Sequence, residues 1–292
     1  MLEIVSSKIE EIISVLENTG YYLINEQKKR GYKTFQKDDG SLLTELDLAS
    51  DILIKNELKS LFGDVKVLSE ENSYEENVKI VNEKFCFLLD PIDGTSSFDK
   101  GKDFTINLAF CVNGCPVISF IHNPLQKIIL FSDGNNAFKR FGGRAVKLDK
   151  IKSAGKSEFL IKGKQKPLKI AIGTHNFANK AFVSAMVVEI QKCGYNFTTY
   201  GLKAFSAMEK LLSFVNNEID AFWTSRKCKD WDILPAIPIL NAIGAKYYTA
   251  NPTLFNNNNF DSGTFIVTRY EDLLNDLVDV SEKIADKLQT VI

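Results

Sequence analysis

The stretch that most restricts how this chain can fold covers residues 85–98 and reads FCFLLDPIDGTSSF. Its first five residues are apolar, which is typical of a short strand buried on both faces of a sheet. The run ends on Asp90, and Asp93, Gly94 and Thr95 follow closely. A buried carboxylate is costly unless it is paired, so two acids at the end of such a strand predict a bound cation. For Asp90 and Asp93 together we favour a functional site over a surface turn.

The overall composition is that of a globular protein with one large or two medium domains. The 292 residues include 36 basic and 37 acidic residues, and the net charge of −1 argues against a surface that binds a nucleic-acid polymer. The five cysteines form no C-x-x-C pair and mostly lie in apolar runs, as expected of reduced core residues. The chain has no apolar run of transmembrane length and no signal-peptide pattern at its start. We therefore expect a cytoplasmic protein without a membrane span.

The first half of the chain, residues 1–150, has an α+β pattern. Amphipathic helices are predicted over residues 3–29 and again from about Asp47 onward, and a short strand over residues 65–68 leads into acidic residues. Residues 104–132 are rich in Phe, Ile and Val and contain Asn-Gly and Asn-Pro turns, which predicts an antiparallel meander.

The second half, residues 151–292, has a different pattern. A basic, polar stretch over residues 147–169 is interpreted as an exposed connection. Strands and helices then alternate as in an α/β layer. Helices are predicted over residues 178–193, 203–216, 231–243 and 270–288.

Five acidic residues begin or end predicted elements and offer only oxygen ligands: Asp47, Glu70, Asp90, Asp93 and Asp232. Hard cations such as Mg²⁺ prefer oxygen ligands, whereas a zinc site would recruit His or Cys. Taken singly, three of them also have structural interpretations. Asp47 and Asp232 suit helix N-termini, and Glu70 suits a solvated loop. A shared Mg²⁺ site is the interpretation that accounts for all five.

The Gly94-Thr95 pair that follows the acids predicts a phosphate-binding turn. If Thr95 begins a short helix, the backbone N–H groups there point toward an anion. Metal ions on the same phosphate would activate a water for direct hydrolysis of a phosphate monoester. Haloacid dehalogenase-type phosphatases carry D-x-D-G-T with a nucleophilic Asp, but the spacing here is D-P-I-D-G-T. The extra residue would misplace the second acid, so we exclude the covalent route.

Four motifs in order resemble those of the inositol monophosphatase superfamily. DPIDGTSSF is similar to its D-P-[IL]-D-G-T-x-x-F signature, and DGSLLTELD, LSEE and DWDILPA are similar to its other acidic segments. The resemblance implies a layered α/β/α/β/α sandwich with the site between the two halves. It also implies a Mg²⁺-dependent, lithium-sensitive phosphatase with two or three Mg²⁺ ions per site.

The resemblance implies a role for each matching residue. The metal ligands would be Glu70, Asp90, the Ile92 carbonyl, Asp93 and Asp232. The catalytic residues would be Glu70 together with Asp47 and Thr95, which position the attacking water. Asp93 and the amides of Gly94 and Thr95 would contact the substrate phosphate.

The substrate is less sharply defined by the motifs. Inositol-specific members place a Glu seven residues before the W-D aspartate, where this chain has Ser225, and cations including Arg226 follow. Bisphosphate nucleotidases of the bacterial branch carry S-x-S-H and G-S-x-x-L-K segments, which GTH ending on His175 and YGLK ending on Lys203 match in part. We therefore expect a 3'(2'),5'-bisphosphate nucleotide as substrate, with His175, Lys203 and Arg226 as contacts.

Two alternatives stay open. The substrate could be inositol monophosphate or another sugar phosphate. The chain could also be a catalytically idle relative that binds metal or ligand, although its complete acidic set argues against this. A homodimer is consistent with the resemblance.

Overall fold

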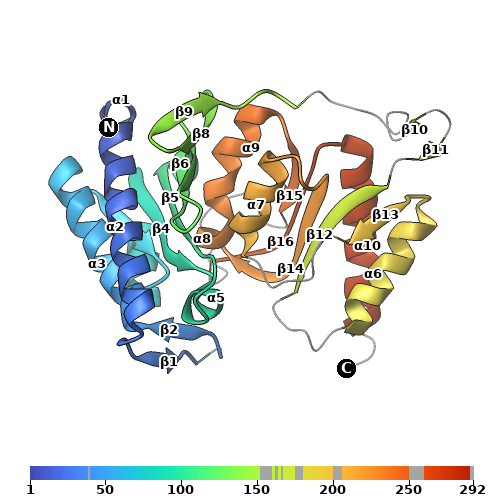
Figure 1. Cartoon of the computed structure of the whole chain (residues 1–292), viewed down its shortest axis with the longest axis horizontal. Coiled ribbons are helices and arrows are strands. Elements are labelled where there is room, and N and C mark those ends of the chain that lie inside the picture. The colour runs from blue at the N-terminus through green and yellow to red at the C-terminus, as the bar shows by residue number, and fades with distance from the viewer. Residues whose placement is uncertain are drawn as a thin grey trace.

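A computed structural model describes residues 1–38, 40–151, 160–161, 164–165, 167–174, 180–199, 206–249 and 260–289. Two β-sheets are separated by one layer of helices and covered on their outer faces by two more (Figure 1). The order of layers is α/β/α/β/α, as expected from the four motifs. No helix in the described ranges combines the length and the apolar character needed to cross a membrane.

The larger sheet has seven strands in the order β3-β4-β5-β6-β7-β8-β9. Only β3 and β4 are parallel, and every other neighbouring pair is antiparallel. The strands are β3 (Lys66–Ser69), β4 (Phe85–Asp93), β5 (Thr105–Val112), β6 (Cys115–Asn123), β7 (Ile128–Ser132), β8 (Ala137–Phe141) and β9 (Arg144–Lys147). The predicted meander is confirmed as β5–β7. It continues through β8 and β9, which the sequence did not predict.

The smaller sheet has five strands in the order β13-β12-β14-β16-β15. Strand β12 runs parallel to β13 and β14, whereas β16 is antiparallel to β14 and β15. The strands are β12 (Leu168–Thr174), β13 (Phe197–Thr199), β14 (Ala221–Lys229), β15 (Lys246–Thr249) and β16 (Asp261–Thr268). Two short hairpins lie outside both sheets: β1 (Thr34–Gln36) with β2 (Leu42–Thr44), and β10 (Leu160–Ile161) with β11 (Lys164–Gln165).

Most of the helices form the three helical layers. One outer layer contains α1 (Leu2–Ser7), α2 (Ile9–Lys29) and α3 (Glu45–Phe62), and the other contains α6 (Lys180–Lys192) and α10 (Glu271–Gln289). The middle layer contains α7 (Ala207–Val215), α8 (Asp230–Ile233), the 3₁₀ turn η3 (Leu234–Ala236) and α9 (Ile237–Ile243). Two further helices follow strands of the larger sheet, α4 (Tyr74–Ile80) after β3 and α5 (Thr95–Asp99) after β4.

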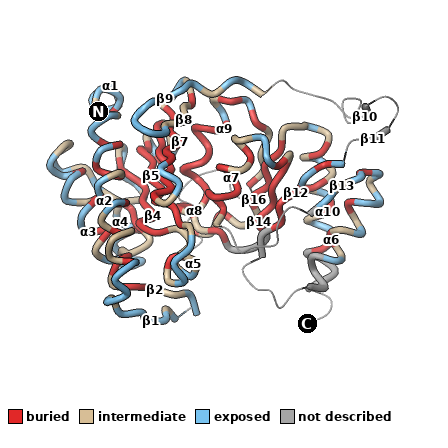
Figure 2. Tube along the Cα trace, in the orientation of Figure 1, coloured by how far each residue is buried: buried red, intermediate tan, exposed pale blue. Residues whose placement is uncertain are grey.

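Burial follows these layers, with buried residues in both sheets and the middle helices and exposed residues on the outer helices (Figure 2). One apolar cluster joins the middle layer to both sheets and contains residues from both sides of residue 150, such as Leu88 and Ile239. The division into halves at residue 150 therefore stays a prediction.

Strand β4 explains why the site lies where it does. Phe87 and Leu89 belong to the apolar cluster under α2 and α3, whereas Cys86 and Leu88 belong to the cluster shared with the middle layer. Because side chains alternate along a strand, Asp90 lies on the same face as Cys86 and Leu88. The apolar run of β4 thus delivers a carboxylate to the middle helical layer, where α8 lies.

Candidate active site

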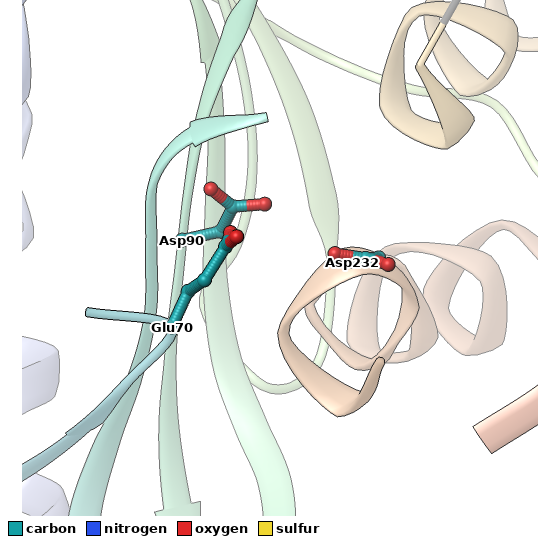
Figure 3. A group of neighbouring side chains, drawn as sticks. All are labelled: Glu70, Asp90 and Asp232. Atoms are coloured by element: carbon teal, nitrogen blue, oxygen red, sulfur yellow. The ribbon is translucent and has the colours of Figure 1, made fainter. Parts of the chain in front are cut away.

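Three carboxylates from distant parts of the chain meet between β4 and the middle helices. Glu70 directly follows β3, Asp90 lies on β4, and Asp232 lies on α8. One carboxylate oxygen from each lies within 4.8 Å of the other two. Figure 3 shows Glu70 and Asp90 beside each other, with Asp232 opposite on α8. We call these three residues the acidic triad.

Asp90 is the most buried member of the triad, with 1% of its surface exposed. Its Oδ1 accepts a hydrogen bond from the Ile92 N–H at 3.1 Å, but its buried Oδ2 has no hydrogen-bond partner in the described part of the chain. Burial raises the pKa of Asp90 well above its usual value, and the charges of Glu70 and Asp93 raise it further. An unpaired buried carboxylate oxygen facing two other acids suits a cation with oxygen ligands.

Asp232 has a similar environment. Burial raises its pKa well above the usual value, and the charges of Asp93 and Glu70 act in the same direction. Its Oδ2 also accepts a hydrogen bond from the Lys229 N–H at 2.8 Å. Asp232 therefore caps the start of α8, as its structural interpretation predicted, and also faces the triad. The prolines that follow do not displace it, because the helix changes to the 3₁₀ turn η3 only after Ile233.

Asp93 lies beside the triad but is not one of the three residues within 4.8 Å of one another. Its Oδ2 accepts hydrogen bonds from Thr105 Oγ1 at 3.2 Å and Asn107 Nδ2 at 3.3 Å, and the Ser206 side chain also lowers its pKa. Burial raises the pKa of Asp93, and these hydrogen bonds lower it in part. Its charge raises the pKa of Asp90 and Asp232, which places it within electrostatic range of both.

Asp47 and Thr95 form a hydrogen-bonded pair near this group. Thr95 Oγ1 lies 3.0 Å from Asp47 Oδ1 and 3.1 Å from the Ile92 carbonyl oxygen. Asp47 Oδ2 accepts hydrogen bonds from Thr44 N–H at 2.7 Å and Thr44 Oγ1 at 2.5 Å, which completes a capping box at the start of α3. Burial raises the pKa of Asp47 to about 6, although its hydrogen bonds to Thr44 and Thr95 oppose the rise. One oxygen of Asp47 thus caps the helix while the other binds Thr95.

Gly94 makes the turn between β4 and α5. Its φ of 92° and ψ of 36° lie in the left-handed region, which favours glycine. A Cβ at this position would lie 3.6 Å from Ser206 Cβ, so α7 approaches the turn closely. The predicted helix beginning at Thr95 is confirmed as the five-residue α5.

Two further residues meet the triad at Glu70. Lys37 belongs to the β1–β2 hairpin, and its Nζ lies 2.8 Å from Glu70 Oε1 and 3.1 Å from Glu71 Oε1. Burial raises the pKa of Glu71 to about 7, and the neighbouring Glu70 charge adds to the rise. The LSEE motif contains Glu71, but nothing in the sequence spacing indicates that Lys37 comes near it.

The start of α7 brings three residues that the sequence did not assign to the site. Ser206 and Glu209 form a capping box, with Ser206 N–H to Glu209 Oε2 at 2.8 Å and Glu209 N–H to Ser206 Oγ at 3.1 Å. Burial raises the pKa of Glu209 to about 8. Lys210 is also buried, and burial lowers its pKa while electrostatic interactions with Cys228, Asp93 and Glu209 act against that change. The S-x-x-E spacing was the sequence signal for this helix start.

The predicted substrate contacts are only partly described. His175 and Lys203 lie outside the described residues, and Arg226 lies on β14 without a described side chain. The predicted helix over residues 203–216 is observed from Ala207 onward, capped by Ser206. Within the described part of α7, Lys210 is the lysine that interacts electrostatically with Asp93.

This arrangement places oxygen ligands for a divalent cation and a hydrogen-bonded hydroxyl beside the Gly94 turn. The triad, with Asp93 and the Ile92 carbonyl close by, offers oxygen ligands of the kind Mg²⁺ prefers. The Asp47–Thr95 pair offers a hydroxyl and a carboxylate for handling a proton.

Comparisons with known proteins identify the family of this chain and several relatives. The model of the inositol monophosphatase family matches residues 7–285. The chain is 29% identical over 174 residues to 3'(2'),5'-bisphosphate nucleotidase CysQ of Haemophilus influenzae, covering 59% of this chain and 61% of that relative. It is 25% identical over 256 residues to inositol monophosphatase 1 of Saccharomyces cerevisiae, covering 84% and 83% of the two chains. The alignment with the bisphosphate nucleotidase thus spans about three fifths of that relative's length.

The fold is similar to that of solved structures. One is an IMPase/NADP phosphatase complexed with Mg²⁺ and phosphate, with a TM-score of 0.69 and 19% sequence identity. That similarity covers 94% of this chain and 95% of the other. At this identity the comparison shows the fold alone.

Proposed function

Because the chain belongs to the inositol monophosphatase family, a family of metal-dependent phosphatases, we propose that it is a Mg²⁺-dependent phosphomonoesterase. It hydrolyses a small phosphorylated metabolite by direct attack of water. No covalent phosphoenzyme forms.

The observation that carries this proposal is the acidic triad. Three carboxylates, one directly after β3, one on β4 and one on α8, lie within 4.8 Å of one another, and Asp90 Oδ2 is buried there without a partner among the described residues. Such a cluster repels itself unless a cation binds. Glu70, Asp90 and Asp232 would hold Mg²⁺ together with Asp93 and the Ile92 carbonyl. When bound, Mg²⁺ supplies positive charge to the phosphate and lowers the pKa of a coordinated water.

The protein's own groups orient the reaction. Asp47 Oδ1 accepts a hydrogen bond from Thr95 Oγ1, which fixes that hydroxyl at the mouth of the phosphate-binding turn. A water that donates to Thr95 Oγ1 is thereby oriented toward the phosphorus, and Asp47 can take up the proton through the hydroxyl. The backbone N–H groups of Gly94 and Thr95 hold the phosphate oxygens.

The substrate we propose is a 3'(2'),5'-bisphosphate nucleotide. The protein would hydrolyse 3'-phosphoadenosine 5'-phosphate to AMP and phosphate. The similarity to a bisphosphate nucleotidase supports this choice, as does Ser225 at the position where inositol-specific members carry Glu. His175, Lys203 and Arg226 remain proposed contacts. Inositol monophosphate is the second candidate, because the yeast inositol monophosphatase aligns over 84% of this chain.

A phosphate-release assay tests both parts of the proposal. Purified protein is mixed with 3'-phosphoadenosine 5'-phosphate, inositol 1-phosphate or p-nitrophenyl phosphate, in Mg²⁺, in EDTA, and in Mg²⁺ with LiCl. We expect release in Mg²⁺ alone, fastest with the bisphosphate nucleotide. Release from none of the three esters would overturn the phosphatase assignment in favour of an idle relative, and a strong preference for inositol 1-phosphate would overturn the substrate.

Two further proposals concern the protein outside its site. We propose a cytoplasmic location and a homodimer, and light scattering of the purified protein tests the second. The location is inferred from the reduced-cysteine pattern of the sequence, and the homodimer from the resemblance to the family.

A further inference from the structure

Lys210 is a buried lysine on the first turn of α7, with 6% of its surface exposed. Its Nζ lies 3.4 Å from the Ser206 carbonyl oxygen, so the side chain folds back toward the helix start. A buried lysine is costly to desolvate and is rare unless charges compensate it. Its position therefore requires an explanation beyond packing.

The compensating charges belong to the acidic site. Lys210 interacts electrostatically with Asp93 and Glu209, and Asp93 in turn interacts with Asp90 and Asp232. Asp93 thus interacts electrostatically both with the Lys210 ammonium and with two members of the triad. Lys37 approaches the same site from the β1–β2 hairpin, at Glu70.

Ser206 links Lys210 to the phosphate-binding turn. Its carbonyl accepts a hydrogen bond from Lys210, its side chain lowers the pKa of Asp93, and its Cβ is 3.6 Å from where a Cβ on Gly94 would lie. Asp93 is held from the opposite side by Thr105 and Asn107 of β5. The carboxylate is therefore fixed jointly by β5 and α7, and Lys210 supplies the one formal positive charge among those residues.

We propose that Lys210 is a positioning residue that fixes Asp93 and sets the charge balance between metal and phosphate. This inference rests on the proposed function. A fixed positive charge at this place weakens the binding of a divalent cation and strengthens the binding of a phosphate anion. Removing the charge must therefore shift the two affinities in opposite directions. A lysine that only packed the core, or only contacted a second phosphate of the substrate, would not produce that pair of shifts.

The test compares Lys210→Met, Lys210→Gln and Lys210→Arg with the wild type by titration calorimetry. Mg²⁺ is titrated first, and inorganic phosphate is then titrated at saturating Mg²⁺. The matched control is Lys192→Met on α6, whose exposed lysine pairs with Glu189 within one turn. Thermal unfolding in EDTA establishes which variants are folded.

We expect both neutral variants to bind Mg²⁺ at least about threefold more tightly and phosphate at least about threefold more weakly, because one unit charge is lost near both ligands. Lys210→Arg keeps the charge and should stay within about twofold of the wild type for both ligands. If Lys210→Met does not fold, Lys210→Gln serves as the neutral variant and is compared with Lys210→Arg and the wild type.

Three outcomes would overturn the inference. In the first, the Mg²⁺ and phosphate affinities of the neutral variants move in the same direction. In the second, both affinities of the neutral variants equal those of Lys192→Met. In the third, Lys210→Arg has the same affinities as the neutral variants. A wild type that binds no Mg²⁺ would instead overturn the proposed function itself. The calorimetry needs no turnover, so the two failures are distinguishable.

Discussion

The hydroxyl of Thr95 donates a hydrogen bond to Oδ1 of Asp47 across 3.0 Å, joining the first turn of α5 to the first turn of α3. The two residues are 48 positions apart in the sequence. Asp47 uses its other oxygen to cap α3 through Thr44, so its side chain cannot turn away without breaking the cap. The helix cap therefore fixes the carboxylate that orients Thr95.

This relationship separates the catalytic role of the pair from its structural role. Thr95→Val removes the hydroxyl and should lower kcat by about 100-fold or more, with an unchanged melting temperature. Thr95→Ser keeps the hydroxyl and is the matched control. Asp47→Asn should lower kcat as well, and should also cost about 1 kcal/mol of stability because its amide opposes the Thr44 N–H. Equal kcat in Thr95→Val and the wild type would exclude the proposed role.

Asp90→Asn tests whether the triad binds metal. The substitution removes a buried charge that faces other acids, so in EDTA we expect the variant to melt at or above the wild-type temperature. Saturating Mg²⁺ should stabilise the wild type by about 2.7 kcal/mol at 100 times the Kd, and should leave Asp90→Asn unchanged. Phosphate release should be nearly abolished. Equal Mg²⁺ stabilisation of both proteins would contradict the assignment.

Gly20 on α2 is required by its close contact with β6. An added Cβ would lie 2.6 Å from His122 Nε2 and 2.9 Å from Pro124 Cβ. Both neighbours are constrained, His122 by its contact with the Ile128 carbonyl and Pro124 by its ring. Gly20→Ala should therefore lose about 1–3 kcal/mol of stability to overpacking, more than the about 1 kcal/mol that alanine gains in a helix.

The control for this substitution is Gly31→Ala. No atom lies within 4 Å of a Cβ at that position, and its φ is outside the left-handed region. We expect no loss of stability in urea unfolding. If Gly20→Ala were as stable as Gly31→Ala, α2 would be able to move away from His122 and Pro124 without a loss of stability, and the prediction would be wrong.

His122 makes the protein sensitive to acid. Burial lowers its pKa from the usual 6.5 to about 4, with its Nδ1 3.2 Å from the Ile128 carbonyl oxygen. Between these pH values the unfolded chain binds the proton and the folded chain does not. The free energy of unfolding therefore falls as pH drops from 6.5 to 4, by about 3 kcal/mol from this residue.

Urea unfolding at pH 7, 5.5 and 4 measures this effect. His122→Asn keeps a donor for the Ile128 carbonyl but cannot titrate in this range. The variant is expected to be less stable at pH 7 because it leaves a cavity, and the difference from the wild type should narrow toward pH 4. A constant difference at all three pH values would show that His122 does not drive the acid sensitivity.

The local pattern of apolar and polar residues was sufficient to predict most helices and strands of the fold. The apolar run before Asp90 predicted β4, and the Gly94-Thr95 turn predicted a helix at Thr95. Strands β8 and β9 were missed because they are short and carry charged residues, and β9 is exposed along its whole length, so their pattern resembles a loop. The start of α7 was placed too early because the Ser206-x-x-Glu209 cap was overlooked, and Lys210 was overlooked with it.

The sequence by itself determined the elements and the acids at their ends, because strand burial, turns and caps depend on residues a few positions apart. It did not determine which cations face those acids. Lys37 reaches Glu70 from a hairpin 33 residues earlier, and Lys210 reaches Asp93 from α7. Such pairs depend on how β-hairpin, sheet and helical layer pack together. Only the tertiary structure decided the spacing of the acidic triad, the Asp90 oxygen that has no hydrogen-bond partner among the described residues, and the buried charge that interacts with Asp93.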